Sequence, residues 1–299
     1  MNVKPWIAAF RLKTLPLALS NTIIGSALAV MNGGYRWSVF ILAAITTVLL
    51  QILSNMANDY GDFVNGKDTA ERIGPKRMVQ SGEISPKAMF RGMILIGSIC
   101  TVTDSALIWI GTKGIDITNM LIFGVLGIAA IAAAIKYTVG KNPYGYRGLG
   151  DIFVFIFFGL VGVAGTYFLH TQNFSWDILL PASAIGFLSM GVLNMNNMRD
   201  YEADKKAGKH TIVVAMGEKN AAFYQFLLIN GAVLCMIIFT LLNYQSAWQW
   251  LFLLSVPLLA LNLKKVFSYK SNIELYPELP RVSMATLLLS LLFLLGVII

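Results

Sequence analysis

Charged residues are scarce in this sequence, and so are cysteines. Only 13% of the 299 residues are charged, whereas 57% are hydrophobic and the mean hydropathy is +0.68. A soluble domain carries about 25% charged and about 45–50% apolar residues, so the composition excludes an ordinary soluble globule and a disordered chain. The two cysteines, Cys100 and Cys235, both lie in apolar segments, which excludes a disulfide framework and a thiolate metal site.

Long apolar segments instead recur from one end of the chain to the other. A helix needs about 20 predominantly apolar residues to cross the hydrocarbon core of a bilayer. A hydropathy window of about 19 residues finds nine such segments. They predict an all-α, polytopic membrane protein with nine transmembrane helices, at residues 15–31, 38–58, 88–110, 117–139, 152–170, 178–198, 221–242, 247–263 and 282–299.

Lysine and arginine are distributed unevenly between the loops. Of the 23 Lys and Arg residues, all but Arg36 and Lys113 lie before the first span or on the side of the loops that follow even-numbered spans. By the positive-inside rule these loops and the N-terminus are cytoplasmic, and the C-terminus lies outside. This asymmetry explains the net charge of +8 without a nucleic-acid partner.

Acidic and amide residues form two clusters that look like copies of each other. Asn58 precedes Asp62 by four residues, and Asn196 precedes Asp200 by the same spacing, each pair at the end of an even-numbered span. A Gly-Lys-x-Thr sequence follows in both clusters, and the separation between copies is 138 residues at the start and 142 at the end. Two units of four spans predict a parallel repeat, which places a site at the interface of the halves. Within one domain, 1–299, the repeats would cover about 1–145 and 146–275, followed by the ninth helix.

The spacing within these clusters suggests metal chemistry. Residues four apart lie on one face of a helix, so Asp200 and Asp204 would repel each other unless a cation lay between them. Oxygen ligands without His or Cys favour a hard ion, and Mg²⁺ in particular binds one or two carboxylates and completes its shell with substrate phosphates. The alternatives are a solvated loop for each cluster taken alone, and a role only in topology for Arg72 and Arg77. With a diphosphate bound, the neighbouring basic residues would contact its oxygens: Arg72, Lys76, Arg77, Lys141 and Lys209.

These motifs resemble the UbiA-type superfamily of intramembrane aromatic prenyltransferases, whose members have nine helices and two Asp-rich motifs after the second and sixth. Tyr137 and Lys141 are similar to the family's Tyr-x3-Lys element, and Arg11 matches a basic position near the diphosphate. The residues that match the two Asp-rich motifs are Asn58, Asp62, Asn197, Asp200 and Asp204.

The first motif departs from the usual family pattern. The family's Asp-x3-Asp would place an acid at position 66, but this chain has Gly66 there and its next acid is Asp68. The run 58–82, with its Arg-x-Gly-Pro-x-Arg sequence, and the run 144–151 are most similar to the 1,4-dihydroxy-2-naphthoate polyprenyltransferases of menaquinone synthesis. The departure leaves open whether Asp68 helps to hold a loop or joins the metal ligands that the resemblance implies: Asn58, Asp62, Asp200 and Asp204.

The resemblance implies an Mg²⁺-dependent transferase with a UbiA-like bundle and a site at the cytoplasmic face of a bacterial inner membrane. It would join a polyprenyl diphosphate to 1,4-dihydroxy-2-naphthoate, with loss of CO₂ and diphosphate, to give a demethylmenaquinone, and it implies no obligatory protein partner. The catalytic candidates are Asp62, Asp200, Asp204, Tyr137 and Lys141. The substrate-binding candidates are Arg11, Asn58, Arg72, Arg77, Asn197, Tyr201 and Lys209.

Two other functions remain as alternatives. One is a member of the same superfamily with another acceptor, such as 4-hydroxybenzoate, homogentisate, a chlorophyllide or a haem. The other is a transporter, whose substrate site would lie near the bilayer midplane rather than at one face.

Aromatic faces stabilise cations, so the tyrosines at the motifs, Tyr60, Tyr137 and Tyr201, are candidates to shield an allylic cation, with interfacial anchoring as the alternative. Asp104 lies inside the third span, where an acid is costly. Either that span ends early near Thr103, or Asp104 pairs with a neighbouring helix.

Overall fold

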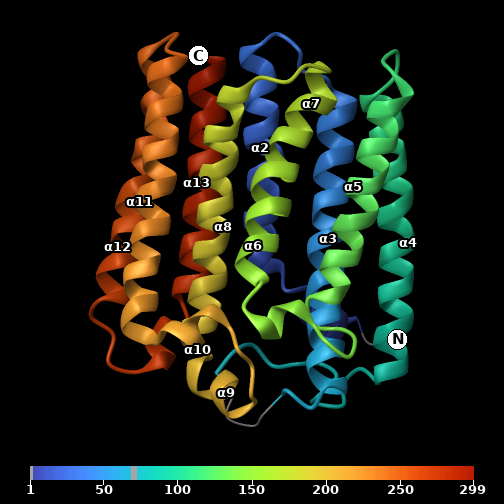
Figure 1. Ribbon diagram of the computed structural model, residues 1–299, viewed down its shortest axis with the longest axis vertical. Helices are drawn as coiled ribbons and strands as arrows, with labels where there is room; N and C mark the ends of the chain where they lie inside the picture. The colour runs from blue at the N-terminus through green and yellow to red at the C-terminus, as the bar shows by residue number, and fades with distance from the viewer. Residues whose placement is uncertain (1–2, 69–72) are drawn as a thin grey trace.

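The computed structural model describes residues 3–68 and 73–299, and these residues form helices and loops without a β-strand. Nine helices of the described chain are long and apolar enough to cross a membrane, which confirms the predicted all-α fold with nine spans. Figure 1 shows them as a bundle of roughly parallel rods. The chain is a multi-pass membrane protein.

The spans differ in how regular they are. The first four contain α1 (Lys4–Phe10) with η1 (Leu12–Thr14) and α2 (Leu15–Met31), then α3 (Trp37–Val64), α4 (Pro86–Gly111) and α5 (Ile117–Lys136). The fifth joins α6 (Gly150–Val154), the π-helical segment η3 (Phe155–Gly165) and α7 (Thr166–Thr171), and the sixth joins η4 (Trp176–Ile178) to α8 (Leu179–Arg199). The last three are α11 (Glu218–Leu242), η5 (Ala247–Ser255) with α12 (Val256–Val266), and η6 (Asn272–Leu275) with α13 (Glu278–Ile298). Three short helices lie in the loops: η2 (Tyr144–Arg147), α9 (Tyr201–Lys206) and α10 (Ile212–Met216).

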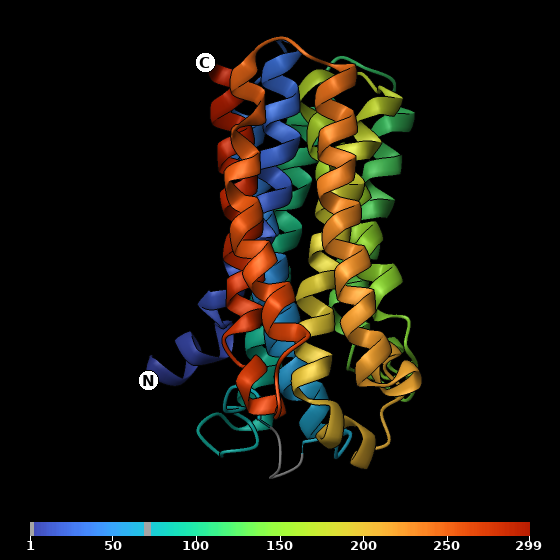
Figure 2. The ribbon, with the colours of Figure 1, turned by 90° about the vertical axis from the view of Figure 1, so that its left-hand side faces the viewer.

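The two chain ends lie at opposite ends of the bundle, as an odd number of spans requires. The N-terminus lies at the lower end in Figure 1, together with α9 and α10, and the C-terminus lies at the upper end. Helix α1 projects sideways from the lower end (Figure 2), and Arg11, between α1 and η1, adopts a left-handed backbone conformation with φ 51°. Both acidic clusters therefore lie at the same end of the bundle as the N-terminus.

Most of the buried apolar side chains come from the second half of the chain together with α2. Ile24 of α2, Ile185 of α8 and Phe293 of α13 belong to one buried cluster. A smaller cluster joins Met56 of α3 to Met89 of α4. Because lipid tails are as apolar as the helices, close van der Waals packing rather than hydrophobic burial holds such helices together.

Helices η3 and α8 are in close contact at the glycines Gly159 and Gly186. A Cβ atom at Gly159 would lie 2.7 Å from the carbonyl oxygen of Ala182 and 2.8 Å from the Cα atom of Gly186. Both neighbours are backbone atoms, so a side chain at Gly159 would push the two helices apart. Small residues at such crossings are a common solution in membrane bundles.

We expect Gly159→Ala to destabilise the protein by about 1–3 kcal/mol, the usual cost of overpacking. Gly124→Ala on α5 is the matched control, because a Cβ atom there has no atom within 4 Å to collide with. Thermal unfolding of the purified proteins in detergent would compare them. Equal melting temperatures for the two variants would contradict the role given to Gly159.

Candidate active site

The two acidic clusters open into one cavity of about 640 Å³ that extends into the membrane-spanning part of the bundle. Asp62 of the first cluster and Asp200, Asp204 and Lys209 of the second line it. Its deeper lining is mostly apolar and comes from α3, α4, α5 and η3. The cavity therefore joins a charged end to an apolar interior.

Asp62, in the last turn of α3, is the centre of the charged end. Its side chain is 3% exposed and forms an ion pair with Arg77. The Tyr146 hydroxyl donates a hydrogen bond to Asp62 Oδ1 at 2.6 Å. A buried carboxylate needs such partners because it has lost its hydration.

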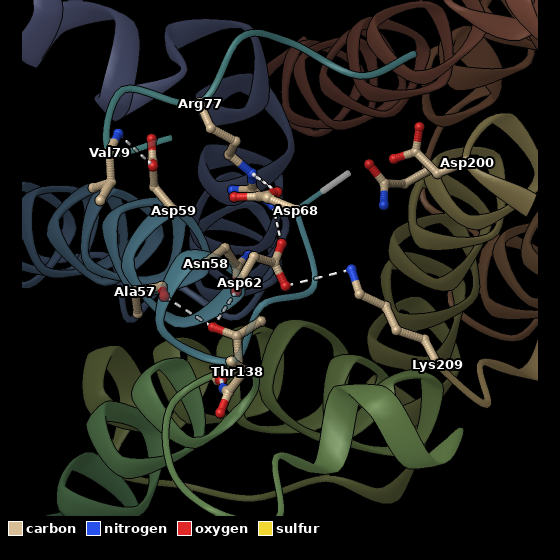
Figure 3. Close-up of polar contacts among 12 residues, drawn as sticks. Ala57, Asn58, Asp59, Asp62, Asp68, Arg77, Val79, Thr138, Asp200 and Lys209 are labelled. Atoms are coloured by element: carbon tan, nitrogen blue, oxygen red, sulfur yellow. Dashed lines mark hydrogen bonds and ion pairs between the residues drawn. The ribbon is translucent and has the colours of Figure 1, made fainter. Parts of the chain in front are cut away.

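Lys209 joins the two clusters directly. Its Nζ atom lies 3.3 Å from Asp62 Oδ1 and 3.3 Å from Asp204 Oδ1, and Figure 3 shows it reaching from the second cluster toward Asp62. A second link is the hydrogen bond from Lys67 Nζ to the carbonyl oxygen of Ala207 at 2.5 Å. The expectation that these distant stretches of sequence meet at a common cavity is confirmed.

The two clusters also share a backbone shape. In both, the amide of the lysine in Gly-Lys-x-Thr closes a turn onto an acid five residues earlier: Lys67 N to Asp62 O at 2.8 Å, and Lys209 N to Asp204 O at 2.9 Å. The glycines before them have φ values of +63° and +66°, which favour glycine. This geometry pairs Asp62 with Asp204, at the separation of 142 residues, rather than with Asp200.

Asp200 lies at the junction between α8 and α9 and is held by its neighbour in sequence. Arg199 donates from Nε to Asp200 Oδ1 at 2.9 Å and from Nη2 to Asp200 Oδ2 at 2.6 Å, a two-pronged pairing that is among the stronger kinds of ion pair. Both side chains are 3% exposed, and both residues line the cavity. Arg199 was not among the predicted site residues.

Asp59 holds the loop that carries Arg77. Asp59 is 1% exposed, and its carboxylate accepts hydrogen bonds from the backbone amides of Met78 at 2.8 Å and of Val79 at 3.0 Å. Figure 3 shows the contact with Val79. Arg77 Nε lies 3.6 Å from Asp68 Oδ1, so Asp68 also faces this arginine.

The chain after α5 is anchored to the first cluster through Thr138. The Thr138 hydroxyl donates to the carbonyl oxygen of Ala57 at 2.9 Å and contacts Asn58 Oδ1 at 3.2 Å. A Cβ atom at Gly61 would lie 2.6 Å from the Thr138 carbonyl oxygen, so Gly61 permits the close approach. This contact places the neighbouring Tyr137 on the cavity wall.

The environment fixes the protonation of several groups outside the spans. Burial and the Asp62 charge raise the pKa of Tyr146, so its hydroxyl remains a donor at neutral pH. Burial raises the pKa of Asp204 against the opposing effect of Lys209. Burial acts to lower the pKa of Arg77, but the charges of Asp62 and other acids outweigh it and the pKa is raised, so Arg77 remains charged.

The predicted site residues are not all at the cavity. Those that line it are Arg11, Asn58, Asp62, Arg77, Tyr137, Asn197, Asp200, Asp204 and Lys209. Asp68, Lys141 and Tyr201 are not part of its lining, and neither is Tyr60, which packs against Phe90. Lys141 is exposed, because α5 ends at Lys136 and the chain turns at Gly140, where φ is +113°. Arg72 lies outside the described residues.

Four residues that contact the site were not among the predicted site residues: Asp59, Thr138, Tyr146 and Arg199. The sequence carried a signal for Arg199 alone, since an arginine directly before a motif aspartate is a natural partner for it. The others act through contacts between distant segments.

Asp104 does not end its span. Helix α4 continues to Gly111, so the early end near Thr103 is wrong. A Cβ atom at Gly127 of α5 would lie 2.0 Å from Asp104 Oδ2, which means that the carboxylate occupies the space left by a glycine. Asp104 and Gly127 both line the deep part of the cavity.

Oxygen donors that could bind a metal lie at the charged end of the cavity. Within residues 3–68 and 73–299, however, no three His, Cys, Asp or Glu side chains come together as a metal-binding group. The carboxylates are instead neutralised by Arg77, Arg199 and Lys209. The charged end of the cavity offers the carboxylate and amide oxygens of Asn58, Asp62, Asp200 and Asp204, which suit a hard cation such as Mg²⁺.

Comparison with known proteins identifies the family. The UbiA prenyltransferase family matches residues 18–274, so the chain belongs to that family. It is similar to the 1,4-dihydroxy-2-naphthoate octaprenyltransferases of Haemophilus influenzae, with 46% identity over 100% of this chain and 97% of the relative, and of Escherichia coli, with 42% identity over 99% and 96%. A UbiA homologue from Archaeoglobus fulgidus bound to GPP and Mg²⁺ shares the fold, with a TM-score of 0.67, 16% identity and coverage of 99% and 100%.

We expect Asp59→Ala to release the loop that carries Arg77. Two buried amides would lose their acceptor, at about 1–3 kcal/mol each, and every 1.4 kcal/mol is about tenfold in an equilibrium. Trypsin should therefore cleave after Lys76 or Arg77 at least about tenfold faster. Glu83→Ala is the control, since Glu83 pairs with Lys76 at the exposed rim of the same loop. Equal cleavage rates for the two variants would rule out an anchoring role for Asp59.

Proposed function

We propose that this chain transfers a polyprenyl group from a polyprenyl diphosphate to 1,4-dihydroxy-2-naphthoate. The observation that carries the proposal is the meeting of Asp62 with Asp204 and Lys209 at the charged end of a cavity whose interior is apolar. Such a cavity suits a substrate with a diphosphate head and a hydrocarbon tail. The names of the Haemophilus and Escherichia relatives support the choice of acceptor.

The basic residues around the cavity bind the diphosphate. Arg77, Arg199 and Lys209 form ion pairs with the acids, and Arg77 and Arg199 are buried, so their N–H groups need little rearrangement to reach phosphate oxygens. Preorganised donors stabilise charge that develops on a leaving group. Arg11 lies on the lining at the end of α1 and adds a further positive charge.

The same end of the cavity suits Mg²⁺. We propose Asn58, Asp62, Asp200 and Asp204 as the residues that hold it, with Asp68 reserved for Arg77. The Lys209 ammonium, equidistant from Asp62 and Asp204, marks a position where a cation is favourable. The Archaeoglobus structure, which holds GPP and Mg²⁺, supports metal dependence. When bound, Mg²⁺ supplies charge neutralisation to the diphosphate.

An aromatic wall lines the cavity next to its charged end. It consists of Tyr137, Tyr144, Phe153 and Phe157, with ring centroids 5.3, 4.0 and 6.2 Å apart in that order. Ring faces stabilise a cation, and the apolar surroundings exclude the water that would capture it.

The bonds change as follows. The bond between prenyl carbon 1 and the diphosphate oxygen breaks, and its electron pair leaves with the diphosphate. The acceptor carbon that bears the carboxylate forms the new carbon–carbon bond. CO₂ then departs and leaves its electron pair in the ring, which becomes aromatic again, so the product is a demethylmenaquinone in its reduced form.

We further propose that the site faces the cytoplasm at a bacterial inner membrane, with the N-terminus inside and the C-terminus outside. The distribution of Lys and Arg supports this orientation, because the basic loops surround the site. The matched turns at Gly66 and Gly208 support an origin of the two clusters as parallel repeats of about 1–145 and 146–275, followed by a ninth helix.

Purified protein supplied with Mg²⁺, a radiolabelled polyprenyl diphosphate and one acceptor at a time should label 1,4-dihydroxy-2-naphthoate. Labelling of 4-hydroxybenzoate or homogentisate should be at least about 100-fold slower, since sites discriminate strongly against acceptors that leave buried polar groups unpaired. Product with 4-hydroxybenzoate and none with dihydroxynaphthoate would overturn the proposed acceptor while keeping the family reaction.

We expect Asp204→Asn to lower kcat by about 100-fold or more, as loss of a charge-stabilising group does, and to raise the Mg²⁺ concentration that gives half-maximal rate. EDTA should abolish activity and added Mg²⁺ restore it. Glu202→Gln removes an exposed acid from the same helix, α9, and should leave both quantities unchanged. An Asp204→Asn enzyme with the normal Mg²⁺ requirement would argue against Asp204 as a ligand.

A further inference from the structure

Below the charged end, polar side chains follow one face of α3 into the membrane. Gln51, Ser54 and Asn58 are spaced by three and four residues, so they share a helix face, and all three line the cavity. Asn21 of α2 also lines it. We call these four residues the polar stripe. A polar stripe within a span faces protein or a functional cavity, since lipid cannot satisfy it.

Packing between helices accounts for a neighbouring residue but leaves part of the stripe unused. Asn55 donates to the carbonyl oxygen of Phe10 and to Thr14 Oγ1, both at 2.9 Å, and so ties α3 to the first span. Gln51 donates from Nε2 to Asn55 Oδ1 at 3.3 Å, which leaves its Oε1 atom for another donor. Within the described residues, the Ser54 hydroxyl and the Nδ2 atom of the 4%-exposed Asn21 form no hydrogen bond, and Asn21 Oδ1 accepts from Thr22. These groups are available to a ligand.

The depth of the stripe matches the part of the substrates that follows the diphosphate. At 1.5 Å per residue, Ser54 lies about 12 Å along α3 from Asp62, and Gln51 about 16 Å. A prenyl tail has no hydrogen-bonding group, so against the tail alone these polar atoms would stay unpaired and destabilise the complex. A polar, flat molecule would satisfy them.

The aromatic wall supplies the complementary surface. Tyr144 and Phe153 are stacked with centroids 4.0 Å apart, and the Tyr144 hydroxyl is already engaged by the carbonyl oxygen of Ala133 at 2.8 Å. Tyr144 therefore offers its ring rather than its hydroxyl to the cavity. A polar stripe together with stacked rings fits an aromatic ring that carries hydroxyl groups.

We propose that Gln51 and Ser54 bind the hydroxyl groups of the aromatic acceptor and hold its ring between the polar stripe and the aromatic wall, which makes them specificity-determining residues. This inference rests on the proposed function, because it takes a dihydroxylated aromatic acid as the acceptor. Asn21 completes the subsite from α2. A close fit there explains Gly162, where a Cβ atom would lie 2.6 Å from Asn21 Nδ2.

The test compares acceptors that lack one hydroxyl. For wild type, Ser54→Ala and Gln51→Leu, we would measure KM for 1,4-dihydroxy-2-naphthoate and inhibition constants for 1-hydroxy-2-naphthoate and 4-hydroxy-2-naphthoate. Each variant should raise KM for the dihydroxy acceptor at least about tenfold. One of the two analogues lacks the hydroxyl that the changed residue binds, so its inhibition constant should stay within about twofold of the wild-type value. KM for the prenyl diphosphate should not change.

Ser38→Ala is the matched control, because Ser38 is an exposed residue at the start of the same helix and should change none of these constants. Inhibition constants for both analogues that rise in parallel with KM would mean that the substitutions disturb the helix, and the proposal would be wrong. Variants with a normal KM for the acceptor would also overturn it. A wild-type enzyme that gives no product with dihydroxynaphthoate would instead reject the proposed function, and this subsite with it.

Discussion

The neutralisation of buried carboxylates by cations, one of which reaches across from the other cluster, is the interaction on which the site depends. Asp62, Asp200 and Asp204 are all almost inaccessible to solvent, and an isolated buried charge is strongly unfavourable. Lys209 links Asp62 to Asp204 across the interface of the two clusters. Asp62 takes one of its two cations, Lys209, from the other cluster, so the contact between the clusters stabilises this buried charge.

This pairing also prepares the site for exchange. The cations that neutralise the acids are the groups an incoming diphosphate requires, and the acids that hold those cations are the groups a divalent ion requires. Substrate and metal entering together would replace internal ion pairs with external ones at nearly constant net charge. The cost of desolvating charge is therefore already met by the fold before the substrate binds.

The sequence predicts the fold well because the bilayer imposes strong rules on it. Nine spans follow from apolar length, and the motif acids follow from their repetition. The sequence could not show whether the two acidic clusters align with a separation of 138 or 142 residues. The matched backbone turns at Gly66 and Gly208 pair Asp62 with Asp204, at a separation of 142. The resemblance to the family's Tyr-x3-Lys element predicted Lys141 as a site residue, but α5 ends at Lys136 and Lys141 is exposed outside the cavity lining. Asp59 and Tyr146 act through contacts between distant segments, which no local pattern records.

Asp59 and Asp62, two acids of the first cluster, have different partners because they lie on different faces of α3. Successive residues on an α-helix are about 100° apart, so Asn58 and Asp62, four apart, face the cavity together, while Asp59 points toward the backbone of the loop at Met78 and Val79. That loop carries Arg77, which returns to pair with Asp62. Asp59 thus positions the loop whose Arg77 pairs with Asp62, and the turn of the helix between Asp59 and Asp62 directs the two carboxylates to these different partners. A shift of one residue in this register would turn both acids away from their partners, because each residue of an α-helix is rotated by about 100° from the one before it.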